Sequence, residues 1–236
     1  MTSSDFEQQV NSVAMLSEPI RRELYRYVIA QPEPVSREQA ATGVGVPLHI
    51  AKFHLDKLEE DGLLEAEYRR PPGRTGPGAG RPAKVYRRSS RHISVSLPER
   101  RYDLASRILA DAVDTAHRTG RPVDVLVSEA AREAGQTLAE QARQAADDGT
   151  PPGDAFTAAG RALAANGYEP RRAGDHMTLS NCPFHDLAQR HRDLVCGFNL
   201  ELINGLLDTL PAGGLCGTLD PAPGRCCVTV GAAPED

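Results

Sequence analysis

The chain has 236 residues, of which 40% are hydrophobic, 5% are aromatic and none is tryptophan, and its formal net charge is −5. This composition favours a helix-rich protein of one or two domains over a β-sandwich. No apolar run approaches the ~20 residues of a membrane span, and the acidic N-terminus lacks the pattern of a secretory signal. We therefore expect a cytoplasmic protein with reduced thiols and no membrane partner.

Charge is unevenly distributed along the chain. Residues 1–98 carry 14 Lys and Arg against 12 Asp and Glu, whereas the remainder carries 13 against 20. Eight basic residues fall within 69–91, and no acidic residue occurs between Tyr68 and Pro98. A local basic block in an acidic protein predicts contact with a specific polyanion.

The first predicted helix spans residues 17–30. Ser17 is a candidate cap and Pro19 falls in the first turn, where proline is tolerated. An apolar stripe at four-residue spacing indicates one buried face. Its members are Ile20, Leu24 and Val28.

Two further helices are predicted at 36–42 and 47–60. Ser36 followed three residues later by Gln39 is typical of a capping box. The second of these helices begins at Pro47 and follows the turn "GVGV". Its buried face is expected to hold Ala51, Leu55 and Leu58.

A β-hairpin is predicted after the third helix. The segments "LLEAEYRR" and "KVYRR" favour strands, and they are joined by a loop rich in Pro, Gly and Arg. Three helices followed by such a hairpin form the winged helix-turn-helix pattern, with the basic loop as its wing.

Helix 47–60 would be the DNA recognition helix, because its other face carries polar and basic side chains. The alternative is a solvated basic loop on an unrelated helical protein. The expected contacts from the helices are Ser36, at a helix N-terminus, with His49, Lys52, Phe53 and Lys57. The expected contacts from the wing are Arg69, Arg70, Arg74, Arg81, Lys84, Arg87 and Arg88.

The second half of the chain reads as an α+β domain. Residues 98–118 predict an amphipathic connector helix that pairs two subunits, and further helices are predicted at 123–147, 154–166, 184–195 and 197–209. Strands are predicted on both sides of a Gly-Asp turn at 174–175, in "GTL" at 217–219 and in "CCVTV" at 226–230. The fold class is thus mainly α with small β: a DNA-binding domain (1–96), a connector and dimerisation helix (97–120) and a C-terminal α+β sensor domain (121–236).

All five cysteines lie between residues 182 and 227, and an odd number in a cytoplasmic chain argues against a disulfide framework. A straight helix between Cys182 and Cys196 would hold them about 20 Å apart. They can share a ligand only if the predicted helix 184–195 is broken, at "RHRD" or near Gly197. Buried thiols without any ligand are the alternative reading.

Two resemblances follow from these segments. "HIAKFHLDKLEEDGLLEAEYRR" followed by "GRPAKVYRR" resembles winged-helix repressors of the ArsR/DeoR-like class. "NCPF", a later Cys, and a distant Cys before a short strand resemble the SufR-type regulators, which sense iron–sulfur clusters.

The SufR resemblance implies an iron–sulfur cluster on Cys182, Cys196 and Cys226. Cys227 is held in reserve, since neighbours on a strand face opposite ways. His185 lies three residues after Cys182, which also suits zinc. Cys216 fits no pattern and is expected to be a small core residue.

The resemblance further implies a homodimer that binds a near-palindromic operator and controls cluster-assembly genes. The alternative function is a winged-helix regulator that responds to zinc or a small apolar ligand, with structural cysteines. Catalysis is not expected, because no Ser/His/Asp order, paired carboxylates, P-loop or dinucleotide-binding glycine pattern occurs.

Overall fold

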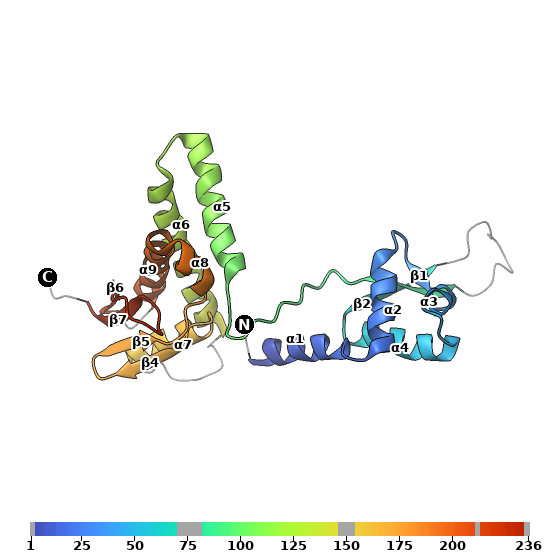
Figure 1. Cartoon of the computed structure of the whole chain (residues 1–236). Helices are drawn as coiled ribbons and strands as arrows, with labels where there is room; N and C mark the ends of the chain where they lie inside the picture. The colour runs from blue at the N-terminus through green and yellow to red at the C-terminus, as the bar shows by residue number, and fades with distance from the viewer. Residues whose placement is uncertain (1–2, 70–81, 146–153, 211–212, 234–236) are drawn as a thin grey trace. The chain divides into compact units, whose positions relative to one another are not determined.

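The computed structural model describes residues 3–69, 82–145, 154–210 and 213–233 (Figure 1). The chain divides into two compact units, one ending at Val95 and the other beginning at Ser96. Each unit has its own hydrophobic core, and the two are considered separately.

The N-terminal unit is a three-stranded antiparallel sheet with helices packed against it. The strand order is β1-β3-β2, and Val35 of β1 lies opposite Tyr86 of β3. The predicted three helices and hairpin are confirmed, whereas α1 and β1 were not predicted. The elements are α1 (Ser3–Met15), α2 (Pro19–Ala30), β1 (Val35–Ser36), α3 (Arg37–Val44), α4 (Leu48–Glu60), β2 (Leu64–Arg69) and β3 (Ala83–Arg88).

Helix ends in this unit follow from their capping residues. The Ser36 hydroxyl accepts from the Gln39 N–H while the Gln39 side chain accepts from the Ser36 N–H, so the predicted capping box is confirmed. The predicted Ser17 cap is wrong. Glu18 caps α2 through Oε2, 2.6 Å from the Arg21 N–H, because the Ser17 hydroxyl donates back to the Ala14 carbonyl.

The predicted apolar faces form the core of this unit. Leu24 and Val28 of α2 are buried, and Ile20 is partly buried. The predicted inward face of α4 is confirmed, because Ala51, Leu55 and Leu58 are each fully buried. The outward face of α4 is thereby fixed relative to the hairpin.

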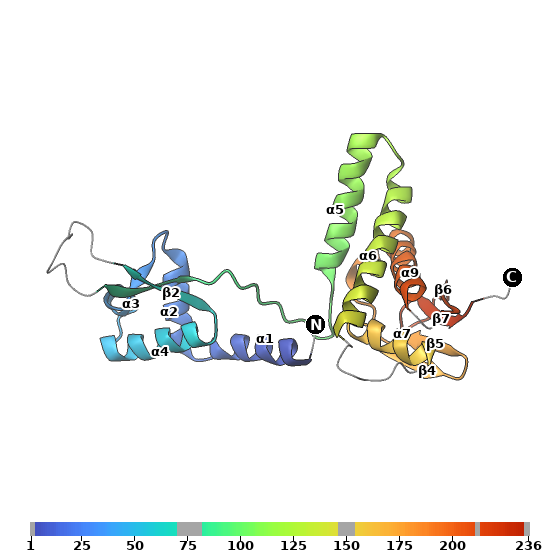
Figure 2. The same ribbon diagram turned by 180° about the vertical axis from the view of Figure 1, so that it is seen from behind.

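The C-terminal unit combines helices with a four-stranded antiparallel sheet of order β4-β5-β7-β6, which agrees with the predicted α+β pattern. Figures 1 and 2 show α5 and α6 as a long antiparallel pair with α9 beside α6. The elements are α5 (Tyr102–Thr119), α6 (Val123–Ala145), α7 (Ala155–Ala164), β4 (Pro170–Ala173), β5 (His176–Leu179), α8 (His185–Arg190), α9 (Arg192–Thr209), β6 (Leu215–Leu219) and β7 (Val228–Ala232).

Three predicted boundaries in this unit are wrong. The helices predicted at 184–195 and 197–209 meet at His191 rather than at Cys196, since α8 ends at Arg190 and α9 begins at Arg192. α5 begins at Tyr102 rather than at Pro98, because Arg101 has non-helical φ and ψ of −123° and 51°. β7 begins at Val228, so Cys226 and Cys227 lie before the strand. α5 packs its Leu104, Ala105 and Ile108 into the core of this unit.

Glycines allow α6 and α9 to cross closely. A Cβ on Gly135 would lie 2.0 Å from the Leu202 carbonyl oxygen, and one on Gly205 would lie 2.1 Å from that of Arg132. The two backbones therefore touch in the second half of α9. Within the described ranges, no helix is long and apolar enough to cross a membrane.

Candidate DNA-binding face and cysteine site

The outward face of α4 carries the predicted recognition residues. His49, Lys52 and Phe53 are exposed, and the Phe53 side chain remains 55% exposed. Because an apolar ring is open to solvent beside an imidazole and an ammonium, this face can contact both base edges and phosphates. Within the described residues, His49 and Lys52 have no side-chain partner in the protein.

Other predicted DNA contacts have acidic partners within the unit. Lys57 Nζ lies 2.7 Å from Glu60 Oε2, and Arg69 pairs with Glu33 at 3.1 Å and with Glu67. These pairs are exposed and weak, so phosphate can compete for both cations. The Ser36 hydroxyl is used by the capping box, although the helix N-terminus it caps remains at the surface.

Lys84 differs from its prediction as a phosphate contact. Its side chain is only 16% exposed, and its ammonium pairs with Asp56 at 3.0 Å and with Glu59. Burial disfavours the charged form, but hydrogen bonds from Lys84 to Glu59 and Asp56 outweigh it and raise the lysine pKa. We therefore assign Lys84 to the interior of the unit rather than to DNA.

Asp56 anchors a charged cluster that the sequence did not reveal. It accepts hydrogen bonds from Tyr86 Oη at 2.6 Å and from Arg37 Nη2 at 2.7 Å, besides that from Lys84. Burial alone would raise the pKa of Asp56, but these three bonds outweigh it and lower the pKa to about 2. The pKa of Tyr86 is raised to about 12, first by burial and then by its bond to Asp56.

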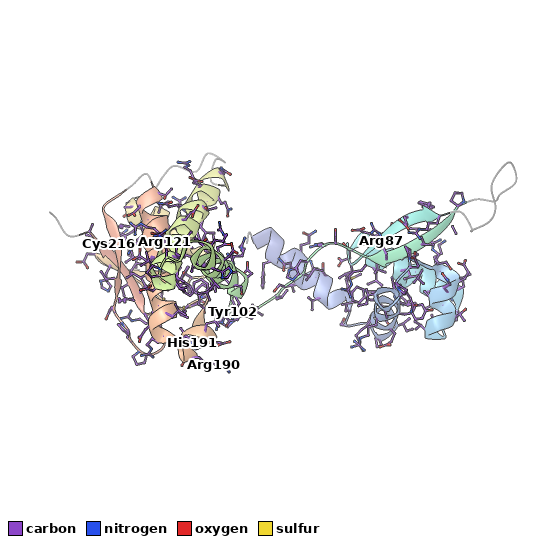
Figure 3. The ribbon with its side chains drawn as sticks, turned by 90° about the horizontal axis from the view of Figure 1, so that it is seen from above. Arg87, Tyr102, Arg121, Arg190, His191 and Cys216 are labelled. Carbon is purple, nitrogen blue, oxygen red and sulfur yellow. The ribbon has the colours of Figure 1, made fainter. Side chains whose placement is uncertain are left out.

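The predicted wing is only partly described. Arg70, Arg74 and Arg81 lie outside the described residues. Arg87 and Arg88 are exposed on β3, and Figure 3 labels Arg87, which pairs with Glu65 at 2.8 Å. Both arginines end the strand that follows the wing loop.

In the C-terminal unit, the break between α8 and α9 brings distant cysteines together. His191 has φ of −134° and ψ of 56°, which ends α8 before α9 begins at Arg192. The prediction that the helix is interrupted within "RHRD" is therefore confirmed. Cys182 precedes α8, while Cys196 lies in the second turn of α9.

Four thiols gather near this break. The Sγ atoms of Cys196 and Cys227 lie 2.9 Å apart, and Cys182 and Cys226 interact thiol to thiol. Asn199 Nδ2 lies 3.3 Å from Cys226 Sγ, and its own carbonyl accepts from the Tyr168 hydroxyl. The amide thus presents a donor to the Cys226 sulfur.

The surroundings of the thiols shift their pKa values in different directions. Contact with the Cys182 thiol lowers the pKa of Cys226 to about 7 despite burial, with help from Asn199 and backbone N–H groups. The same contact, together with burial, raises the pKa of Cys182. Burial and the Cys227 contact raise the pKa of Cys196 to about 12. Cys226 is therefore the thiol that the protein best stabilises as a thiolate.

A cavity of about 530 Å³ adjoins these thiols. Cys182, Cys226 and Cys227 line it, and within the described residues none of its lining side chains is acidic. Cations from three segments surround it, which suits negatively charged sulfur or another anion. They are Arg100, Arg192 and Arg225, and the His185 imidazole also lines the cavity.

Two expectations about the cysteines need correction. Cys226 and Cys227 do not face opposite ways as strand neighbours, because both precede β7 and both line the cavity. Cys216 is half-exposed on β6 rather than buried in the core. Figure 3 labels Cys216 and His191 well apart, and the Cys216 thiol instead faces the Ala232 carbonyl at 3.7 Å.

The placed side chains do not form a ready site for a single metal ion. Within the described residues, no three His, Cys, Asp or Glu side chains are arranged to hold one. Tetrahedral zinc would need four ligands converging at about 2.0–2.3 Å. Thiols that border a larger cavity suit a ligand with a volume of its own better than a lone ion.

Some candidate residues were not predicted from the sequence. Asn199 is a polar residue on the apolar face of α9, three positions after Cys196, and that position could have indicated it. Arg192 and Arg225 lie four and one positions before cysteines, which is a second usable signal. Asp56 gave no signal, since its partners come from α3 and β3.

Three helices (α2, α3 and α4) followed by a β-hairpin, with exposed polar side chains on α4, have the element order of a helix-turn-helix domain. A sequence model described as a helix-turn-helix domain matches residues 16–67, from the end of α1 to β2. This match supports a DNA-binding transcriptional regulator. No curated protein and no solved structure matches the chain.

Proposed function

We propose that the protein is a dimeric transcriptional repressor whose operator binding is controlled by an iron–sulfur cluster in the C-terminal unit. The cluster ligands would be Cys182, Cys196 and Cys226. The observation that carries this proposal is that the segments before α8 and before β7 bring Cys182 and Cys226 to one cation-lined cavity, while Cys196 of α9 lies against Cys227 at the edge of that cavity. Cluster iron prefers thiolate ligands.

The chain's own residues fit a negatively charged group of this kind. Asn199 would donate to the Cys226 sulfur, and such hydrogen bonds tune a cluster. Arg100, Arg192 and Arg225 would offset the charge of the thiolates. When bound, the cluster would supply a centre that responds to oxidation or to iron supply.

Operator binding would use α4 in the major groove. His49, Lys52 and Phe53 would reach base edges and phosphates, and the arginines of the wing would meet the flanking backbone. Two subunits would then read a near-palindrome with half-sites one helical turn, or a multiple of it, apart. Control of cluster-assembly genes is what the resemblance to the SufR-type regulators implies.

For coupling, the cluster must favour one arrangement of the dimer over another. α5 packs into the core that holds α9, so it is the element through which ligation would reach a partner subunit. Loss of the cluster would then release DNA. Equal affinity of cluster-bound and cluster-free protein for one operator, at fixed salt, would contradict this coupling.

The first experiment measures iron, acid-labile sulfide and zinc in protein purified without oxygen, together with its visible absorption. Matched iron and sulfide with a brown colour are expected. Cys182→Ser, Cys196→Ser and Cys226→Ser should each bleach the protein. The matched control is Cys216→Ser, which should remain brown because Cys216 lies away from the cavity.

Two outcomes would change the proposal. A colourless Cys227→Ser variant beside a brown Cys226→Ser variant would move the third ligand to Cys227. Colourless wild-type protein without matched iron and sulfide would overturn the cluster and leave a winged-helix regulator with a different signal. In-vitro selection of DNA sequences with the full chain tests the operator separately, and an inverted repeat is expected.

A further inference from the structure

The thiols of Cys196 and Cys227 lie close enough for disulfide formation, a reaction that the proposed cluster does not require. The two sulfurs lie 2.9 Å apart, and both cysteines are free thiols. A disulfide has an S–S bond of about 2.05 Å, so a small side-chain movement would join them.

The two thiols differ in access. Cys196 is 7% exposed and does not line the cavity, whereas Cys227 is half-buried and does. A molecule that enters the cavity therefore meets Cys227 first. Cys226 also borders the cavity, but it is 2% exposed, lies against Cys182 and accepts from Asn199.

The cavity selects the charge of what enters. Two of the three arginines among its described lining residues already have partners in the protein. Arg225 pairs with Asp220 at 2.5 Å, and Arg100 donates to Asn181 at 2.6 Å. Arg192 is exposed and, within the described residues, has no side-chain partner. With no acidic side chain among the described lining residues, a small carboxylate would find an unpaired guanidinium within the cavity.

We propose that Cys227 and Cys196 form a reversible intramolecular disulfide by exchange with an anionic low-molecular-weight disulfide that binds in this cavity. This reaction takes place in metal-free protein. It goes beyond the proposed cluster and does not depend on it.

Two exchange steps complete the reaction. The Cys227 thiolate attacks one sulfur of the small disulfide, whose S–S bond breaks and releases one small thiolate. The Cys196 thiolate then attacks Cys227 Sγ in the mixed disulfide and releases the second. Two protein thiols are oxidised, the small disulfide is reduced to two thiols, and the two protons of the protein thiols end on them.

The test uses the reduced, chelator-treated full chain, with its metal content measured in the same sample. Oxidised glutathione is the anionic probe and hydroxyethyl disulfide is the neutral one. Remaining thiols are alkylated at timed intervals, and peptide mass spectrometry assigns the linkage. A Cys196–Cys227 bond is expected, reversible by dithiothreitol, with a glutathione mixed disulfide on Cys227 as its precursor.

Variants separate the chemistry from the charge selection. Cys196→Ser should accumulate the mixed disulfide on Cys227, and Cys227→Ser should lose the linkage. Cys216→Ser should react as the wild type does. Arg192→Gln should slow the reaction with oxidised glutathione about two- to fivefold, which is the scale of one partly exposed charge pair. The rate of reaction with hydroxyethyl disulfide should not change.

Several results would overturn the proposal. A dominant Cys182–Cys226 bond, or a mixed disulfide that forms first on Cys216, would show that the pair is not selected. An equal effect of Arg192→Gln on the reaction rates of both probes would contradict the proposal that the cavity prefers an anionic disulfide. Because iron and sulfide are assayed separately, failure of the cluster would not affect these outcomes.

Discussion

The hydroxyl of Tyr86 lies 2.6 Å from Asp56 Oδ1, which ties the second strand of the hairpin to the recognition helix. Arg37, at the start of α3, also donates to both of these groups. The orientation of α4 relative to β3 is thus held by a polar cluster as well as by apolar packing. Such clusters are costly when one partner is removed.

We predict that Tyr86→Phe lowers the free energy of unfolding of the N-terminal unit by about 1–2 kcal/mol, because a partly buried carboxylate loses a donor. The matched control is Tyr68→Phe on β2, whose side chain is 67% exposed and should have no measurable effect. Denaturant unfolding followed by circular dichroism measures both. Equal stabilities of the two variants would show that the hydrogen bond is not stabilising.

We predict that the N-terminal unit loses free energy of unfolding in acid because the pKa of Asp56 is lowered in the folded state. Its folded pKa of about 2 lies below its ordinary value of 3.8, so the folded state binds a proton less readily than the unfolded chain. The stabilisation is complete above about pH 4 and declines as the pH falls towards about 2. It amounts to no more than about 2 kcal/mol, since the side chain keeps 28% exposure.

The carboxyl carbon of Asp56 reports this titration directly by nuclear magnetic resonance. A midpoint near 2 is expected, and one near 3.8 would contradict the cluster. Asp56→Asn should unfold with a weaker pH dependence between 4 and 2 than the wild type shows. Tyr68→Phe should keep the wild-type dependence.

We predict that replacing Lys52 by alanine lowers the affinity for DNA without lowering the free energy of unfolding. Its ammonium is exposed on α4 and, within the described residues, is not paired inside the protein. Lys52→Ala should weaken operator binding and reduce the slope of log affinity against log salt by about one. Arg26→Ala, which removes an exposed α2 charge paired with Glu23, is the control and should leave that slope unchanged.

Because α6 and α9 cross closely, we predict that alanine substitution at two glycines of α9 has opposite effects on stability. A Cβ on Gly205 would meet the Arg132 backbone at 2.1 Å, whereas one on Gly197 would meet nothing within 4 Å. Gly205→Ala should lower the melting temperature of the C-terminal unit, with a cost above about 1–3 kcal/mol. Gly197→Ala should be neutral or stabilising by up to about 1 kcal/mol. Equal melting temperatures would contradict the close crossing.

Local patterns predicted most elements of the fold because their signals are contained in a few neighbouring residues. The capping box at Ser36 and the apolar face of α4 are examples. Boundaries were less accurate where backbone dihedrals depend on tertiary contacts. Cys226 and Cys227 were assigned to a strand for their spacing, yet the Cys226 N–H donates to the Leu179 carbonyl before β7 begins.

The candidate site was predicted only in part, because its chemistry depends on distant segments. The sequence indicated which cysteines to consider, but not that Cys196 meets Cys227 or that Asn199 meets Cys226. Likewise, Lys84 counts as a wing cation by position, and only the fold shows that Asp56 and Glu59 neutralise it. Pairings across the fold are long-range facts that no local periodicity contains.

The interruption at His191 has a consequence for turnover of the protein. Because α8 stops there, Cys196 near the start of α9 meets a thiol from a chain segment far away in sequence, and a bridge between such thiols that persisted on unfolding would close a long loop in the unfolded chain. Loop closure of that kind stabilises the folded state in proportion to how much freedom it removes. A bridged unit would then resist proteolysis more than an unbridged one, so the abundance of the protein would itself record whether its thiols are occupied.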